Sequence, residues 1–328
     1  MAKRRKPKRS SAKKIKIRLR LGDVPIYMLA LLLLSGIVLS FLDYYGVLTY
    51  TQITQLLGLS DKAVVSIDDA QLSVHSIDVG QGDCTLIVSG STTVLIDGGE
   101  ADAGASVLEY LNKYGIKRID YLIATHPHSD HIGGLPEVMA AVPVGKIIMP
   151  KLMDEVVPVS SSYSNLLKAI SDSGLHITRA VPGDIYELGS DARLEIIAPV
   201  RDDYEELNNY SVVCRVICGE TEFLFMGDAE KAAEVDIIGS GAELSADFLK
   251  VGHHGSSSSS RKPLLEEVLP EYAVIYCGDD NSFNHPSEKT LHRLREYGVC
   301  IYRTDIQGNI IFKSDGINIS AEAEYAYN

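Results

Sequence analysis

The order of short apolar segments constrains the fold of this chain most strongly. From Gln71 onward, runs rich in β-branched residues alternate with glycine-containing turns, which predicts a meander of strands. Strand–helix units follow the meander, and the same succession then occurs a second time. We expect strands at residues 72–79, 84–90, 92–99, 119–125, 144–150, 194–200, 211–219, 221–228, 246–252 and 272–278. Helices are expected at residues 105–114, 135–141, 164–174, 229–238, 263–270 and 287–298. Two sheets packed face to face, with the helices outside, would bury every apolar face, which predicts an α/β fold.

The first fifty residues differ in character from the rest of the chain. Residues 1–20 contain eleven Lys and Arg and no acidic residue, whereas the whole chain has 31 basic and 44 acidic residues. Residues 24–42 carry no charge, and a helix of this length at ~1.5 Å per residue nearly spans a hydrocarbon core of roughly 30 Å. Because a basic segment before such a run stays in the cytoplasm, we predict a cytoplasmic tail (1–23), a transmembrane helix (24–42), a spacer (43–70) and an external domain (71–328).

Two alternatives to this reading of the N-terminus are open. A cleaved signal peptide would also begin with a basic segment and an apolar run, but the run is long and no small-x-small cleavage site follows it. The basic tail could bind nucleic acid, although contact with anionic lipid explains it equally well. The five cysteines are odd in number and have no CxxC spacing. We expect them to be buried apolar residues rather than disulfides or zinc ligands.

One short loop carries the strongest chemical signal. After the expected strand at 119–125, the chain places His126, His128, Asp130 and His131 within six residues. Imidazole nitrogens and carboxylate oxygens suit Zn²⁺, Mn²⁺ or Fe²⁺. In an extended segment His126 and His128 point the same way, and the next two ligands turn aside as a helix begins. A single loop can therefore serve two metal ions, which explains the cluster better than exposed surface histidines do.

This HxHxDH pattern resembles the metallo-β-lactamase superfamily, and further motifs narrow the resemblance. In chain order these motifs are DVGQGD at 78–83, DGG at 97–99, GD at 227–228, GHHGS at 252–256 and HP at 285–286. Over about residues 72–316 the chain resembles the exported metallo-β-lactamase domain of the ComEC/Rec2 competence proteins. The resemblance implies an αββα four-layer sandwich, here preceded by one transmembrane helix instead of the multispanning channel of that family.

The resemblance also implies a set of metal ligands. His126 and His128 would hold a first ion, Asp130 and His131 a second, and Asp228 would bridge the two. The cofactors would be two divalent transition-metal ions, Zn²⁺ or Mn²⁺.

His254, or alternatively His253, would complete the ligand set. Because neighbouring side chains on an extended segment diverge, we expect one of these two to reach the metal and the other to face the substrate. Asp97 would orient a ligating histidine from beneath the loop. The remaining residues expected behind the ligands or against the substrate are Asp78, Gln81, Asp83, Asn209 and Ser256.

The chain departs from the superfamily pattern at one place. A further histidine is expected just before the strand that leads to Asp228, but residues 207–211 read LNNYS. An Asn carbonyl could substitute weakly, since amide oxygens suit hard cations better than Zn²⁺. We therefore expect the first ion site to be weak, selective for Mn²⁺ or empty.

These residues predict metal-assisted hydrolysis, with Asp130, His253 and His285 as catalytic candidates. The resemblance favours a membrane-anchored extracellular phosphodiesterase, most simply a nuclease connected with competence. Alternatives are an esterase or phosphodiesterase acting on cell-envelope polymers or small molecules, such as choline-phosphate esters, and a non-catalytic metal-stabilised domain that binds a ligand or DNA. β-Lactam hydrolysis is disfavoured because fold does not determine function.

The charge of the domain bears on its substrate. Beyond residue 20 there are 20 basic residues against 44 acidic ones, which disfavours binding of DNA through an extended basic surface. A small basic rim is expected from Lys250, Arg261, Lys262 and Arg303. The sequence does not identify a partner channel or receptor.

Overall fold

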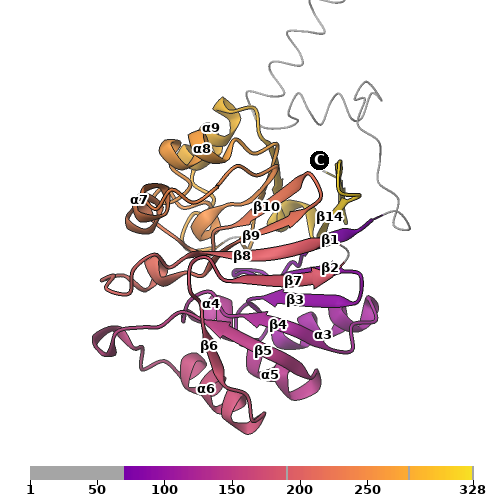
Figure 1. The fold of residues 1–328 in the computed structure, drawn as a ribbon, viewed down its shortest axis with the longest axis vertical. Helices are drawn as coiled ribbons and strands as arrows, with labels where there is room; N and C mark the ends of the chain where they lie inside the picture. Colours follow the sequence, from indigo (N-terminus) through magenta and orange to yellow (C-terminus); the bar gives the residue numbers. More distant parts are fainter. Residues whose placement is uncertain (1–69, 190, 280, 327–328) are drawn as a thin grey trace, which may run out of the picture. The chain divides into compact units, whose positions relative to one another are not determined.

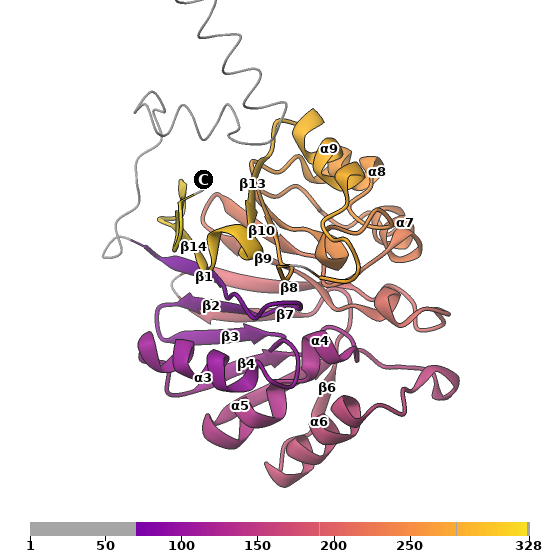
Figure 2. The same cartoon turned by 180° about the vertical axis from the view of Figure 1, so that it is seen from behind.

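The computed structural model describes residues 70–189, 191–279 and 281–326, and these form two β-sheets (Figures 1 and 2). The eight-stranded sheet has the strand order β15-β14-β1-β2-β3-β4-β5-β6. Its strands are β1 (Leu72–Ser76), β2 (Thr85–Ser89), β3 (Thr92–Ile96), β4 (Ile119–Ile123), β5 (Val144–Met149), β6 (Ile177–Arg179), β14 (Ile310–Ser314) and β15 (Ile319–Ala323). The seven-stranded sheet has the order β13-β12-β11-β10-β9-β8-β7. Its strands are β7 (Ile185–Gly189), β8 (Ala192–Ala198), β9 (Val213–Cys218), β10 (Thr221–Phe225), β11 (Phe248–Lys250), β12 (Tyr272–Ile275) and β13 (Cys300–Arg303).

Helices cover the outer side of each sheet. Beside the first sheet lie α3 (Gly104–Lys113), α4 (Ser129–Ile132), α5 (Leu135–Ala141) and α6 (Ser161–Asp172). Beside the second lie α7 (Lys231–Gly239), α8 (Lys262–Val268) and α9 (Glu288–Glu296). Shorter helical turns are η2 (Asp154–Val156), η3 (Leu207–Tyr210), η4 (Gly252–Gly255) and α10 (Thr304–Gln307). Figure 1 shows the first helix group below the sheets and the second group above them.

The strands are apolar on both faces because each sheet packs against the other sheet on one face and against helices on the other. In β2, Ile87 belongs to the core between the two sheets, whereas its neighbour Leu86 packs in the cluster that includes the helices of the first sheet. In β10, Phe223 faces the other sheet and Leu224 packs in the cluster with α7, α8 and α9. Strands buried on both faces are continuous apolar runs, as found here. The order of layers is therefore helices, sheet, sheet, helices.

The two halves of the described chain follow the repeated order expected from the sequence. Each half begins with antiparallel strands and continues with parallel strands joined by helices. The predicted α/β class with two sheets is confirmed. Strands β14 and β15 depart from the repeat. They follow the second half in sequence, but β14 pairs antiparallel with β1 of the first sheet, and β15 pairs antiparallel with β14. Strands β6, β7 and β13 were also not among the expected segments.

The parallel strands bring the chemically active loops to one place. Ile96 at the end of β3 pairs with Ile123 at the end of β4, and Phe225 at the end of β10 pairs with Lys250 at the end of β11. The loops that follow these strands therefore leave each sheet at the same edge. The carboxyl ends of parallel strands are the usual site of function in α/β folds.

The expected tail, transmembrane helix and spacer lie outside the described residues, apart from Ala70. Within the described part of the chain, none of the helices combines the length and the apolar character needed to cross a membrane. All five cysteines lie in the described part and are buried free thiols, as predicted.

Candidate metal centre

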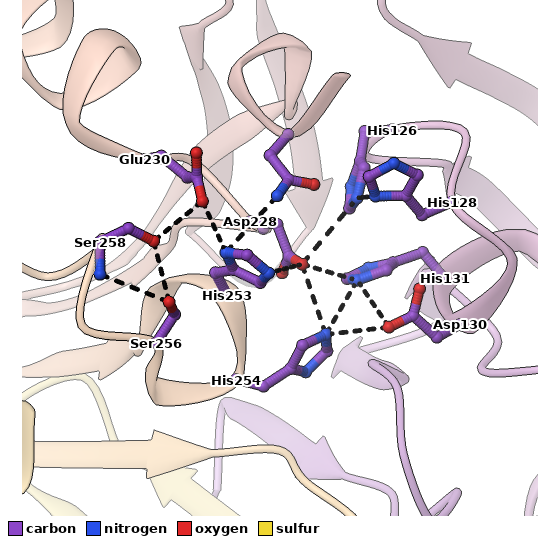
Figure 3. Close-up of polar contacts among 12 residues, drawn as sticks. His126, His128, Asp130, His131, Asp228, Glu230, His253, His254, Ser256 and Ser258 are labelled. Carbon is purple, nitrogen blue, oxygen red and sulfur yellow. Dashed lines mark hydrogen bonds and ion pairs between the residues drawn. The ribbon is translucent and has the colours of Figure 1, made fainter. Parts of the chain in front are cut away.

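Asp228 lies at the centre of a cluster of histidines. Its Oδ2 atom lies 3.2 Å from His131 Nε2 and 3.3 Å from His254 Nε2. The Nε2 atoms of His126 and His253 each lie 3.9 Å from the same oxygen. Figure 3 shows the four rings around this carboxylate. All of these residues except His253 are buried.

The loop after β4 supplies one side of the cluster. His126 and His128 lie side by side, with 3.0 Å between His126 Nε2 and His128 Nδ1. The chain then enters α4, which carries Asp130 and His131. Asp130 Oδ2 lies 3.1 Å from His254 Nε2, so this carboxylate reaches the side of the cluster formed by the second half of the chain.

The loop after β11 supplies the other side, in a conformation that the sequence analysis did not expect. His253 and His254 have φ angles of 49° and 52°, in the left-handed region, rather than extended backbone. Both Nε2 atoms consequently lie within 3.9 Å of Asp228 Oδ2, and the extended backbone on which the expectation of diverging side chains rested is not present. Left-handed backbone at residues other than glycine is strained and gathers at functional sites.

Two of the ligand-type rings, His131 and His254, are oriented by hydrogen bonds to their Nδ1 atoms. Asp97 Oδ2 accepts a hydrogen bond from His131 Nδ1 at 2.8 Å, and Asp97 also accepts from the Thr125 backbone N–H at 2.8 Å. His254 Nδ1 donates to the backbone carbonyl of Tyr276 at 3.0 Å. These contacts turn the Nε2 atoms of both rings toward Asp228. Such partners behind a ligating histidine set its tautomer and raise its basicity.

A buried lysine adjoins the cluster. Lys250, at the end of β11, is 2% exposed and forms an ion pair with Asp83. Its Nζ donates to the Gly227 carbonyl at 2.8 Å and lies 3.6 Å from Asp228 Oδ1. The expectation that Lys250 belongs to a basic rim was therefore wrong, because a lysine this deep compensates buried carboxylates.

The ionisation of the cluster follows from burial and mutual charge. Burial by itself would raise the pKa of Asp228, but the adjacent His131 and His254 hold that pKa well below its ordinary range. Burial lowers the pKa of the His126 imidazole well below its ordinary value. Asp228 is therefore an anion and His126 a neutral nitrogen donor at neutral pH, which are the states that bind a metal ion.

The donor set fits a divalent transition-metal ion. Ligand atoms from Asp83, His131, Asp228 and His254 all lie within 4.8 Å of one another, and all four residues are buried. Among the described residues, Asp228 Oδ1 finds no hydrogen-bond partner. Three carboxylate and imidazole groups buried around Asp228 form a polar cluster, and buried groups of this kind are usually paired or coordinate a metal ion.

Three other expected site residues, Asp78, Gln81 and Asn209, accept hydrogen bonds from backbone N–H groups. Asp78 closes its own turn by accepting from the Gly80 N–H at 3.0 Å, and Gln81 Oε1 accepts from the Gly278 N–H at 3.2 Å. Asn209 Oδ1 accepts from two backbone N–H groups at the start of α7, at 3.1 and 3.2 Å. The oxygen of Asn209 is thus committed to the helix, which leaves it unsuited to replace a missing metal ligand.

His285 and Ser256 lie beside the cluster. The ring centroids of His285 and His253 are 5.4 Å apart, and His285 Nδ1 has no hydrogen-bond partner within the described part of the chain. Burial, followed by the charges of His253 and His254, lowers the pKa of His285 to about 4. Ser256 Oγ lies 2.9 Å from Ser258 Oγ, which in turn donates to Glu230 Oε1 at 2.8 Å.

The sequence analysis missed the roles of two residues. Glu230 accepts from His253 Nδ1 at 2.9 Å and so orients that ring. Its position two residues after the expected bridging Asp228 was a usable signal. Lys250 interrupts an otherwise apolar strand, and a lysine in such a strand requires a buried anion.

Fold and site together define the class of this protein. Residues 77–279 match the model of the metallo-β-lactamase superfamily, so the chain belongs to that superfamily.

The curated relatives refine this assignment. The chain is 29% identical to ComE operon protein 3 of Bacillus subtilis over 259 residues, covering 73% of this chain and 33% of that protein. It is 30% identical to competence protein ComA of Neisseria gonorrhoeae, covering 75% and 33% respectively. It is also 30% identical to recombination protein 2 of Haemophilus influenzae, covering 72% and 28%. The predicted resemblance to the ComEC/Rec2 proteins is confirmed, and the chain spans about a third of the length of these relatives.

Proposed function

We propose that this chain is a metal-dependent phosphodiesterase, most simply a nuclease that acts in DNA uptake or processing. The observation that carries the proposal is the arrangement of four imidazole nitrogens within 3.9 Å of Asp228 Oδ2. The competence and recombination names of the relatives support nucleic acid as the substrate class.

The residues of the centre have separable tasks in this proposal. His126, His128, Asp130, His131, Asp228 and His254 would hold divalent ions. Such ions, when bound, supply Lewis-acid polarisation of the scissile group and lower the pKa of a water molecule. His285, half-buried beside the cluster with a free Nδ1, is placed to contact a phosphate oxygen or the leaving group.

A second candidate substrate is favoured by the pairing of the basic residues that were expected to form a rim. Lys262 Nζ lies 2.8 Å from Glu296 Oε2, and Arg303 Nε lies 3.0 Å from Asp305 Oδ1. With Lys250 buried, three of the four residues of the expected basic rim are neutralised by acidic neighbours. Phosphate affinity for long DNA comes chiefly from unpaired Lys and Arg. A short phosphodiester, or a phosphodiester of a cell-envelope polymer, places less demand on such a rim.

The experiment compares the purified full-length chain with its Asp228→Asn variant. Substrates are bis-p-nitrophenyl phosphate, single- and double-stranded DNA and a choline-phosphate ester, each with Mn²⁺ and with Zn²⁺. Asparagine keeps the volume of Asp228 but removes the charge that the cluster shares. We expect hydrolysis to fall about 10²–10⁴-fold, as for the loss of one catalytic group.

The outcomes separate the candidates. Cleavage of DNA that is lost in the variant supports the nuclease, whereas cleavage of the choline-phosphate ester alone supports the envelope substrate. A wild-type chain that cleaves none of the panel, yet binds DNA equally well with and without the substitution, would identify a binding domain. Activity that survives in Asp228→Asn would place the catalytic centre elsewhere.

We further propose that the chain is a single-pass membrane protein with a cytoplasmic N-terminus and an extracellular catalytic domain. The uncharged residues 24–42 and the basic residues before them motivate this proposal. Protease added to intact protoplasts should remove the domain. A domain that is cut only after the membrane is broken would have the opposite orientation.

A further inference from the structure

Asn208 lies in the segment 207–211, just before β9, where the superfamily pattern leads one to expect a histidine and this chain has none. Asn208 belongs to η3, and its Nδ2 atom lies 3.4 Å from His253 Nδ1. The residue that stands near the expected ligand position therefore contacts a histidine from a different loop. We infer that His253 supplies the missing nitrogen and holds the first ion together with His126, His128 and Asp228, an inference that rests on the proposed metal-dependent function.

The distances around Asp228 support a division of the two consecutive histidines between two ions. His254 Nε2 lies 3.1 Å from Asp130 Oδ2 and 3.3 Å from His131 Nε2, which assigns it to the second ion. His253 Nε2 lies 3.9 Å from Asp228 Oδ2, the same distance as His126 Nε2. This distance is below the sum of a Zn–N and a Zn–O distance, about 4.2 Å. One ion can therefore contact both atoms.

The hydrogen bonds of His253 leave the required nitrogen free. Nδ1 donates to Glu230 Oε1 at 2.9 Å, and Ser258 Oγ donates to the same oxygen at 2.8 Å. Nε2 then carries a lone pair and points at Asp228, as Figure 3 shows. The pair of Glu230 and His253 has the same form as the pair of Asp97 and His131, in which Nδ1 and Oδ2 are 2.8 Å apart. A carboxylate behind a ring in this way is typical of metal-binding histidines.

The backbone conformation of η4 allows both His253 and His254 to face the metal cluster. At two consecutive positions in an extended segment, the second ring would point away from the first. The left-handed φ angles of 49° and 52° instead direct both rings to one side. Glycine would adopt this conformation without strain, so histidine at both positions indicates that both imidazoles are used.

The test measures bound metal rather than activity. The full-length chain and the variants His253→Ala, Glu230→Gln and His292→Ala are dialysed against buffered Zn²⁺ or Mn²⁺, and metal per chain is counted by mass spectrometry. His292 is the matched control, because it is an exposed histidine paired with Glu296 on α9. We expect two ions in wild type and in the control, and one in His253→Ala. Glu230→Gln retains the ring but should weaken the first ion about 10–100-fold.

The Co²⁺ form gives an independent readout. Loss of one nitrogen ligand should change the visible absorption of the first ion and leave that of the second intact, and far-UV circular dichroism checks folding of each variant. Two ions bound with unchanged affinity in both His253→Ala and Glu230→Gln would overturn the role of His253 while leaving the proposed hydrolase intact. A folded wild-type chain that binds no ion would overturn the metal centre as a whole.

Discussion

At the scale of single residues, Lys250 shows how a buried charge takes part in the site without contacting substrate. Its ammonium group pairs with Asp83 and faces Asp228 Oδ1 at 3.6 Å. Asp228 therefore presents Oδ2, and not Oδ1, to the four histidines. A buried cation of this kind stabilises the carboxylates when the centre holds no metal.

Replacing Lys250 by methionine should accordingly destabilise the metal-free protein. Removal of one partner of a buried pair costs about 3–5 kcal/mol because the other charge stays buried and uncompensated. We expect a lower urea midpoint in the presence of a chelator, and a larger recovery on adding Zn²⁺ than in wild type. Lys262→Met is the matched control, since its pair with Glu296 is exposed and such pairs contribute less than about 1 kcal/mol. Equal effects of the two substitutions would contradict the role assigned to Lys250.

At the scale of elements, the loop between β1 and β2 supports the histidine loop from below. The Asp83 backbone N–H donates to the Asp130 carbonyl at 3.1 Å, which holds the two loops together. Gly82 lies directly against that carbonyl at φ +133°, and a Cβ at this position would collide with it. The DVGQGD motif thus acts through close backbone approach as well as through its aspartates.

Gly82→Ala should therefore displace Asp130 and weaken metal binding, whereas Gly80→Ala should not. Gly80 also has a positive φ, of +71°, but a Cβ there would meet nothing within 4 Å in the described part of the chain. The control retains the backbone strain of about 1–2 kcal/mol for alanine in the left-handed region. Metal affinity measured by calorimetry distinguishes the two. Comparable losses in both variants would show that general destabilisation, and not the contact with Asp130, is responsible.

At the scale of the whole molecule, one buried carboxyl links stability to pH. Glu234 on α7 is 2% exposed, and its carboxylate accepts from the Arg261 N–H that begins α8. Burial raises the pKa of Glu234 from 4.5 to about 7. Because the folded pKa lies above the unfolded one, stability falls as the pH rises from below 4.5 to above 7.

Glu234→Gln should remove this dependence. Relative to the variant, wild type should lose about 2–3 kcal/mol of unfolding free energy between pH 5 and pH 8. Urea denaturation with chelator present measures the difference, and the titration of the histidines cancels because both proteins contain them. Glu267→Gln, on the exposed side of α8, serves as the control. A difference that stays constant with pH would show that Glu234 does not titrate in this range.

The sequence predicted the elements far better than their pairing. Apolar runs and helical spacing correctly indicated α3, α5 and most strands, because period and burial are local properties of the chain. The pairing of β14 with β1 joins residues more than two hundred positions apart, and nothing in the short apolar run at 310–314 specifies its partner. The tertiary structure alone places that strand in the first sheet.

The candidate site shows the same difference between what the sequence predicts and what the tertiary structure decides. The sequence by itself predicted most of the ligand-type residues, since three histidines and an aspartate in one loop have few other uses; Asp83 joins the group only in the structure. Which rings converge was decided by the tertiary structure: the left-handed backbone of His253 and His254, the pairing of Glu230 with His253 and the burial of Lys250 beside Asp83. These depend on where separate loops meet, and the energy of a buried charge is set by neighbours that are distant in sequence.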